Sequence, residues 1–364
     1  MKKRALLCIL TAGMLLLAGC GDSSDASQTS SEPSSAASSQ QSEPVSSAAS
    51  EQTAIQPVKQ SKFEQIGDWT AEQALQVGFY GAQSLQDNTL VFQVQQGMEL
   101  ELIVIDPSNG QELADEDFDT AFISVYGNNI AVREEGKVRL VNARLEELKS
   151  VDVPSEMNLW SYNISSDLGK LSFADEEGIN IYDLATGKEK QLDKHPNPNA
   201  AKYIDNELYK GSFFVDSDKQ LLVRNVRYED ARGYTLFNLN NNRQTFINMP
   251  QARGEQEFIM QNRVCVVHPL ENGSSVVNVC DYLDPERVLT YEMTGLKEGG
   301  KAAMNEEYAY YFAGTKLYQM DLSDGTTREV EIKYQLESPT MMGVTTDNTI
   351  LYADGGVWYS CKLG

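Results

Sequence analysis

The chain has 364 residues, of which 30 are Lys or Arg and 53 are Asp or Glu, so its formal net charge is −23. Such an acidic chain is a poor partner for nucleic acid, because affinity for nucleic acid comes largely from neutralising phosphates. It holds only two histidines, His195 and His268, which leaves little room for multi-histidine metal sites or histidine-based catalysis.

The first 20 residues read MKKRALLCILTAGMLLLAGC. The apolar run over residues 5–19 follows a basic start and is too short to span a bilayer comfortably, which is typical of a secretory signal. It ends in Leu17-Ala18-Gly19-Cys20, which resembles the lipobox of bacterial lipoproteins. The resemblance implies that residues 1–19 are removed and that Cys20 is lipidated. An ordinary cleaved signal with an incidental cysteine is the alternative.

Residues 20–55 are predicted to be a flexible tether. Thirteen of the 35 residues 21–55 are Ser, and none is aromatic, Lys or Arg. Such a stretch cannot bury enough apolar surface to offset the entropy of ordering. Without the three positive charges of the signal, 27 cationic residues face 53 acidic ones, a net charge of −26. Anionic headgroups would therefore not hold the body, and two acyl chains, which suffice for stable anchoring, would do so.

Residues 56–364 are predicted to be one all-β domain. Short Val-, Ile-, Tyr- and Phe-rich runs alternate with Gly, Asn and Asp, and the best helical candidate is Trp69–Gln76. A motif of an apolar strand, a polar residue that is usually Asp or Asn, and in most copies a turn recurs about every 42 residues. Its registration positions are Asp106, Asn142, Asp183, Asn238, Asp281, Asp321 and Ser360. Units of this length with four strands are typical of β-propeller blades, and seven fit. A pair of β-sandwiches or another all-β array is the alternative.

One unit also carries a family resemblance. Ser165–Phe173, followed by Ile181–Lys188, resembles the repeats of TolB-type and related bacterial β-propellers. The resemblance implies a propeller that binds protein or polymer, and it carries over no catalytic residue.

The seventh unit predicts how the ring closes. Outer strands are expected at Gln111–Leu113, Lys188–Leu192 and Arg328–Lys333, but the chain stops at Gly364, too early for an outer strand in the last blade. An unpaired edge invites association with other chains. We therefore expect residues 60–67 to supply the missing strand, antiparallel to 357–363.

The sequence contains few residues in patterns typical of catalysis. His195 lies in a loop between units and His268 precedes Pro269 on a strand, and neither lies near a Gly-x-Ser-x-Gly elbow. The densest acidic cluster lacks EF-hand spacing and is predicted to be a solvated loop. It consists of Glu112, Asp115, Glu116, Asp117 and Asp119. No metal or cofactor is expected, although paired carboxylates in the propeller channel keep a carbohydrate-active enzyme open as the alternative.

The fourth unit is the most distinctive, because its spacing is 55 residues. Two insertions, within 196–210 and 226–233, are expected on the same face of the blade. Residues 195–255 hold eight Lys or Arg and seven acids, unlike the acidic remainder. Since Arg and Tyr favour interfaces, we predict a ligand or partner patch here, with an ordinary surface loop as the alternative. Its candidates are Lys202, Tyr203, Arg224, Arg227, Tyr228, Arg232 and Tyr234.

The cysteines give a prediction about register. Asn272-Gly273 favours a two-residue type I′ hairpin, which would place Cys265 directly opposite Cys280, at a distance that permits a disulfide. Neighbouring reduced thiols are the alternative.

Together these patterns predict a lipid-anchored, extracytoplasmic binding or scaffold module on the outer face of the cytoplasmic membrane or a periplasmic leaflet. It would engage an envelope protein or polymer. The alternatives are an enzyme acting on cell-wall or carbohydrate material, and a sensor or accessory subunit of a membrane complex.

Overall fold

The computed structural model describes most of the chain after the tether. The described residues are 53–364 without 78, 97–98, 120, 156, 158, 160–161, 176–177, 193–211, 216–218, 228–231 and 250–255. The predicted signal, Cys20, nearly all of the tether and His195 lie outside them. No helix of the described residues is long and apolar enough to cross a membrane.

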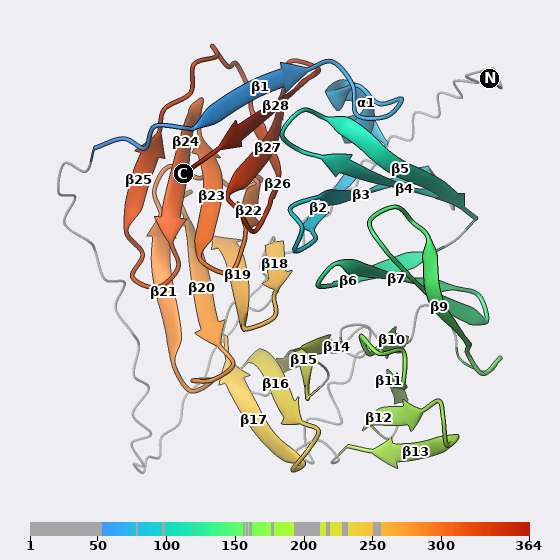
Figure 1. Cartoon of the computed structure of the whole chain (residues 1–364). Helices are drawn as coiled ribbons and strands as arrows, with labels where there is room; N and C mark the ends of the chain where they lie inside the picture. Colours follow the sequence, from blue (N-terminus) through green and yellow to red (C-terminus); the bar gives the residue numbers. More distant parts are fainter. Residues whose placement is uncertain are drawn as a thin grey trace, which may run out of the picture. The chain divides into compact units, whose positions relative to one another are not determined.

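The described residues form seven four-stranded antiparallel sheets, one for each unit (Figure 1). The first three blades contain β2 (Phe79–Ser84), β3 (Leu90–Gln96), β4 (Glu99–Asp106), β5 (Gln111–Phe118), β6 (Phe122–Tyr126), β7 (Asn129–Glu134), β8 (Lys137–Val141), β9 (Glu147–Asp152), β10 (Tyr162–Ile164), β11 (Lys170–Asp175), β12 (Gly178–Asp183) and β13 (Lys188–Gln191).

Blades 4 to 7 follow the same order. They contain β14 (Ser212–Val215), β15 (Gln220–Arg227), β16 (Arg232–Asn238), β17 (Arg243–Asn248), β18 (Gln256–Ile259), β19 (Arg263–Pro269), β20 (Ser275–Asp281), β21 (Val288–Met293), β22 (Ala302–Met304), β23 (Tyr308–Ala313), β24 (Lys316–Asp321), β25 (Thr327–Val330), β26 (Thr340–Val344), β27 (Thr349–Asp354) and β28 (Val357–Lys362). Blade 7 has the order β1-β28-β27-β26, with β1 (Lys59–Phe63) outermost.

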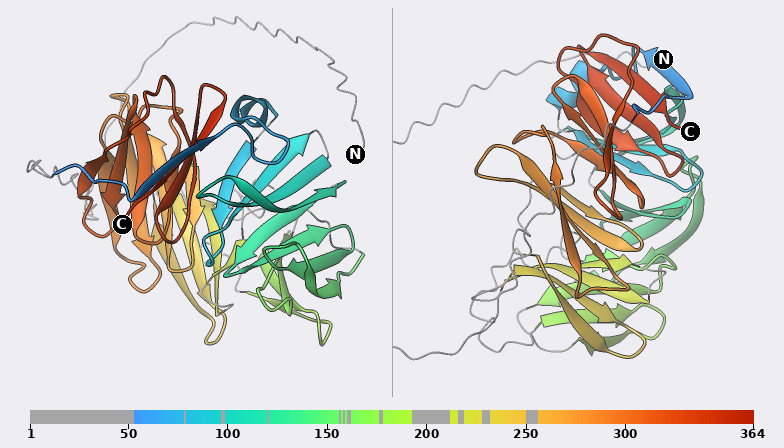
Figure 2. Two further views of the ribbon diagram at one scale, coloured as in Figure 1. Left: turned by 45° about the horizontal axis from the view of Figure 1, so that its top comes forward. Right: turned by 90° about the vertical axis from the view of Figure 1, so that its left-hand side faces the viewer.

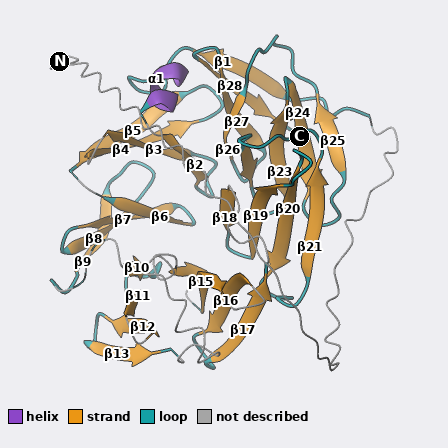
Figure 3. Cartoon of the chain, turned by 180° about the vertical axis from the view of Figure 1, so that it is seen from behind, coloured by secondary structure: helices purple, strands orange, loops and turns teal. Residues whose placement is uncertain are grey.

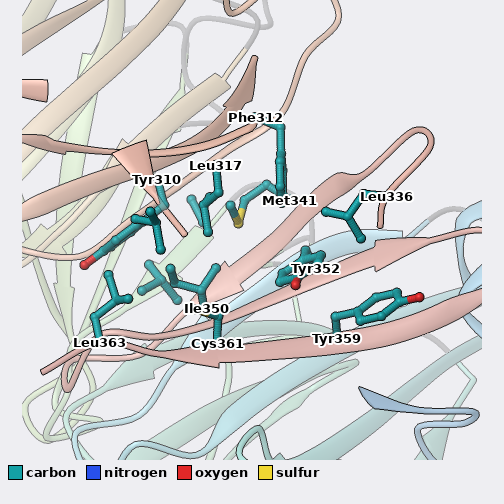
Figure 4. Packing of buried hydrophobic residues seen from close by; sticks show 13 residues of the cluster. Tyr310, Phe312, Leu317, Leu336, Met341, Ile350, Tyr352, Tyr359, Cys361 and Leu363 are labelled. Carbon is teal, nitrogen blue, oxygen red and sulfur yellow. The ribbon is translucent and has the colours of Figure 1, made fainter. Parts of the chain in front are cut away.

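The hydrophobic core lies between the blades. Seven clusters of buried side chains each join two neighbouring blades, including blade 7 to blade 1. Between blades 6 and 7, the rings of Tyr352 and Tyr359 stack at 5.3 Å, and Phe312 meets Tyr352 edge-on (Figure 4). Seven sheets with seven interfaces make a closed seven-bladed propeller, which confirms the predicted fold and excludes paired β-sandwiches.

The repeated acidic position is explained by its turn. Asp321 ends β24 and accepts a hydrogen bond from the Ser323 amide at 2.8 Å, while Gly325 takes a φ of +75° that glycine adopts without strain. Asp106 and Asp183 make the same contact with the backbone two or three residues ahead. The repeat therefore reports a turn with a defined hydrogen bond, which is why it could be aligned from sequence alone.

The two ends of the domain meet in blade 7. β1 pairs antiparallel with β28, from Lys59 opposite Lys362 to Phe63 opposite Trp358 (Figure 2). Just before β1, Ile55 exchanges backbone hydrogen bonds with Glu329 and Glu331 at the outer edge of blade 6. Residues 55–63, here called the strap, thus cover the outer edges of blades 6 and 7.

The single helix of the described residues, α1 (Ala71–Gln76), is drawn in purple in Figure 3. It begins two residues later than predicted because Thr70 is its N-cap, in a capping box with Gln73. It packs Ala71 and Ala74 into the core between blades 7 and 1.

The predicted cysteine register is wrong by one residue. Cys265 lies opposite Val279, and Cys280 lies opposite Val264. Because successive side chains point to opposite faces of a sheet, Cys265 packs towards blade 6 and Cys280 towards blade 4. Both thiols are free and buried, so the predicted disulfide does not form.

Candidate functional site

The two faces of the ring differ in their loops. We call upper the face at which the first strand of each blade begins and its second strand ends, and lower the opposite face. The turns at Asp106, Asp183 and Asp321 follow third strands and therefore lie on the lower face. The connections between blades lie on the upper face, including the one that contains α1.

The two insertions predicted in blade 4, within 196–210 and 226–233, lie mostly outside the described residues, so their common face stays a prediction. β14 begins beside the end of β15, with Ser212 opposite Val223, so the chain enters the blade on the face where β15 ends. Arg227 and Arg232 lie opposite each other, next to the connection between β15 and β16. The structure describes no side chain for Arg224, Arg227 or Arg232. Lys202, Tyr203 and Tyr228 lie outside the described residues.

Tyr234 does not belong to a surface patch, contrary to the prediction. It lies in β16 opposite Ile247 and is 0% exposed in the core between blades 4 and 5. Its hydroxyl hydrogen-bonds Glu257 at 3.0 Å. The alternation of strand β16 turns Tyr234 towards blade 5, so its neighbours in sequence are not its neighbours on the surface.

The acidic cluster is a strand rather than a loop. Residues 112–118 lie in β5, the outer strand of blade 1, where the exposed positions carry most of the acids. Burial raises the pKa of Glu112, and the nearby carboxylates of Asp115 and Asp68 raise it further. No group of residues suited to hold a metal ion occurs among the described residues.

His268 is a core residue of blade 5. It lies in β19 with 5% of its surface exposed, and its Nδ1 has no hydrogen-bond partner in the described part of the chain. Burial lowers its pKa, which favours the neutral ring.

Among the described residues of the upper face, Arg133 is a polar group in an unusual environment. It lies near the end of β7, opposite Phe122, the first residue of β6. Its guanidinium carbon lies 5.4 Å from the ring centre of Phe122 and 5.8 Å from that of Tyr162, the first residue of β10 in blade 3. These three residues, which we call the Arg133 cluster, sit between blades 2 and 3 beside their innermost strands.

The guanidinium of Arg133 is only partly hydrogen-bonded. Nη1 donates to the backbone carbonyl of Tyr162, whereas Nε is enclosed and has no acceptor among the described residues. The buried hydroxyl of Tyr162 likewise has no described partner. A buried donor without an acceptor costs about 1–3 kcal/mol, so this arrangement needs an explanation beyond packing.

Arg139, in the neighbouring strand, shows how a partly buried guanidinium is usually paired. It donates to Glu134 at 2.7 Å and to Glu116 at 2.9 Å, and it lies 5.2 Å from the ring centre of Phe118. Burial alone would lower the pKa of Arg139, but its two carboxylates outweigh that effect and raise it.

Arg133 differs in its electrostatics. Burial lowers its pKa, and the hydroxyls of Tyr126 and Tyr162 offset this only in part. Arginine nevertheless stays charged at neutral pH. Within the described residues, Arg133 makes no ion pair, so its positive charge is compensated by aromatic rings and a carbonyl alone.

Sequence reasoning missed the Arg133 cluster. Residues 131–138 read as an ordinary strand, turn and strand, and Tyr162 is 29 residues away in the next blade. The one usable signal was the alternation in β7, which places Ala131 and Arg133 on the face opposite Ile130 and Val132.

Comparisons with known proteins add little beyond the fold. No family model and no curated protein matches the sequence. A streptogramin B lyase structure is 13% identical, with a TM-score of 0.46, over 84% of this chain and 98% of that chain. The β-propeller domain of Cps50 (Swd1) from Myceliophteria thermophila is 10% identical, also with a TM-score of 0.46, over 79% of this chain and 96% of that chain. These likenesses carry no argument about function.

Proposed function

We propose that this protein is a lipid-anchored, extracytoplasmic β-propeller that binds an envelope protein or polymer on its upper face. The lipobox-like segment and the Ser-rich tether support the anchor. The closed ring, with every blade interface filled by apolar side chains, supports a rigid scaffold rather than a moving one.

One observation carries the choice of face. Arg133 presents a positive charge without a described carboxylate on the upper face, in a chain whose net charge is −23. Buried charges are normally paired or bound to a ligand. The lower face, by contrast, uses its acids in turns, as at Asp106, Asp183 and Asp321.

An enzyme acting on carbohydrate or cell-wall material is the alternative. It would need two carboxylates about 5–10 Å apart within one cleft. No contact or distance among the described residues favours such a pair, so we propose binding rather than catalysis.

The test uses two photo-crosslinking positions in the same blade. Glu135, in the exposed turn after β7, lies on the upper face, and Arg144, in the exposed turn after β8, lies on the lower face. With a crosslinking amino acid at each position in turn, intact envelopes should give a discrete adduct from position 135 and none from position 144. Equal capture from both positions, or none from either, would contradict the proposal.

The anchor is tested separately. Cys20→Ala should release the protein from the membrane fraction, while Cys361→Ala, at a buried cysteine of the domain, should not. A Cys20→Ala protein that remains with the membrane would refute lipid anchoring.

A further inference from the structure

The guanidinium of Arg133 has one nitrogen in use and one edge without a described acceptor. Nη1 is held by the Tyr162 carbonyl. Nε and Nη2 form the other edge, and neither donates to a described residue. Nε is enclosed, so a ligand has to approach this edge from the side of Nη2, which is not among the enclosed atoms without a partner. Two parallel N–H donors on one planar edge match the two oxygens of a carboxylate.

The surroundings hold this edge in place. The rings of Phe122 and Tyr162 lie within cation–π distance of the guanidinium, and the carbonyl bond fixes its rotation. An arginine held in this way loses little further freedom when it binds, which favours affinity. The side chain is half-buried, so part of it remains in contact with solvent.

We propose that the Nε–Nη2 edge of Arg133 binds a carboxylate group of the ligand at the upper face, between blades 2 and 3. This rests on the proposed function and names the chemistry of its ligand. The Tyr162 hydroxyl, also buried without a described partner, is a second donor of the same cluster.

Charge selects a carboxylate over a phosphate. One guanidinium supplies one positive charge, and the chain as a whole carries −23. A carboxylate brings one negative charge, whereas a phosphate monoester brings about two at neutral pH and would meet more repulsion.

Arg139 provides a matched control, because it lies in the same blade beside one aromatic ring but is already paired with Glu116 and Glu134. The full chain, labelled with ¹⁵N-arginine, would be titrated with sodium acetate against sodium chloride at constant ionic strength. We expect a saturable shift of the Arg133 Nε–H resonance with acetate alone, and no shift at Arg139.

Arg133→Lys keeps the positive charge but removes the two parallel N–H donors of the guanidinium. Acetate should raise the thermal midpoint of the wild-type chain and of Arg139→Lys, while the acetate concentration needed for the same rise should increase at least about tenfold in Arg133→Lys. The wild-type titration does not depend on either variant folding.

Three results would overturn the proposal. One is no acetate response at Arg133, or an equal response to chloride. The second is saturation by inorganic phosphate at a lower concentration than by acetate. The third is a shift of the Arg133 Nε–H resonance on changing the pH without added anion, with a titration midpoint typical of a carboxyl group. That result would mean that a carboxylate of the chain itself binds this edge. If crosslinking is selective for the upper face but the acetate experiment gives one of these three results, the proposed function stands and only the carboxylate site is refuted. If Arg133 binds acetate but crosslinking is not selective for the upper face, only the proposed function is refuted.

Discussion

Two regions of the ring differ in whether the chain itself supplies hydrogen-bond and ion-pair partners for their polar groups. One is the interface between blades 2 and 3, and the other is the region where blades 6 and 7 close the ring. At the closure, the chain itself completes the backbone edges and the charged groups, although the buried Tyr352 hydroxyl has no described partner. The strap supplies backbone partners to β28 and to Glu329 and Glu331, and Lys362 pairs with Asp347 at 2.6 Å. Between blades 2 and 3, one edge of Arg133 has no described partner. Groups completed within the chain contribute stability, whereas a group without a partner in the chain can bind a ligand, as we propose for Arg133.

The largest effect should come from removing the strap. Deleting residues 56–68 takes away the fourth strand of blade 7 and the hydrogen bonds of Gln60 to Glu331 and Lys333, while Ile55 stays in place. We expect a loss of roughly 5 kcal/mol, at about 1 kcal/mol per backbone hydrogen bond. The midpoint should fall by more than about 10 °C in one cooperative transition. A tether deletion of equal length, residues 22–34, is the control. An unchanged midpoint after strap deletion would show that the closure is not structural.

Trp358, opposite Phe63 of the strap, should give the next largest effect. Its ring is 1% exposed, meets Phe92 edge-on at 6.0 Å, and donates from Nε1 to the Trp69 carbonyl at 3.1 Å. Trp358→Ala should cost about 3–5 kcal/mol in denaturant unfolding. Leu148→Ala, at a 54% exposed position, should cost less than about 0.5 kcal/mol. Similar losses for both variants would contradict the interface-centred core.

The two arginines of blade 2 give the sharpest contrast in stability. Arg139→Met leaves Glu116 and Glu134 without their cation, and we expect a loss of about 1–2 kcal/mol. Arg133→Met removes a buried charge without a described counterion, and such replacements are often neutral or stabilising. A greater loss from Arg133→Met than from Arg139→Met would mean that Arg133 is a structural residue.

The smallest effect is a pH dependence at the closure. Burial raises the pKa of Asp347, but hydrogen bonds from Lys362, Thr345 and Thr349 outweigh it and hold the pKa below its usual range. The contribution of ionised Asp347 to the free energy of unfolding should therefore be complete above the pKa of an unfolded Asp, about 3.9. It should vanish as the pH falls through the lower pKa of Asp347 in the folded state. Asp347→Asn should cost about 1 kcal/mol or less at pH 7 and nothing at the acid end. A loss that is independent of pH would rule out the ion pair as its source.

The blade number was predictable because each turn carries its own signal in consecutive residues. Asp321, Ser323 and Gly325 make their hydrogen bond and their positive φ within five positions, so the sequence contains all the information. The missing strand of blade 7 was inferable in the same way, from counting strands.

The cysteine register failed because one turn residue behaved differently. A type I′ turn needs a positive φ at both Asn272 and Gly273, but of these two only Gly273 has one, at +79°. The loop takes a third residue, Leu270 bonds to Ser274, and all pairs shift by one. The Arg133 cluster was out of reach for a different reason, since it depends on how blade 3 packs against blade 2.

The most direct measurement is anomalous diffraction from crystals of the full chain soaked in bromoacetate. We expect a bromine peak beside the Nε–Nη2 edge of Arg133, with the carboxylate on that edge, and none at Arg139. A structure in which that edge of Arg133 is bound by a carboxylate of the chain itself, with no bromine peak nearby, would contradict this expectation.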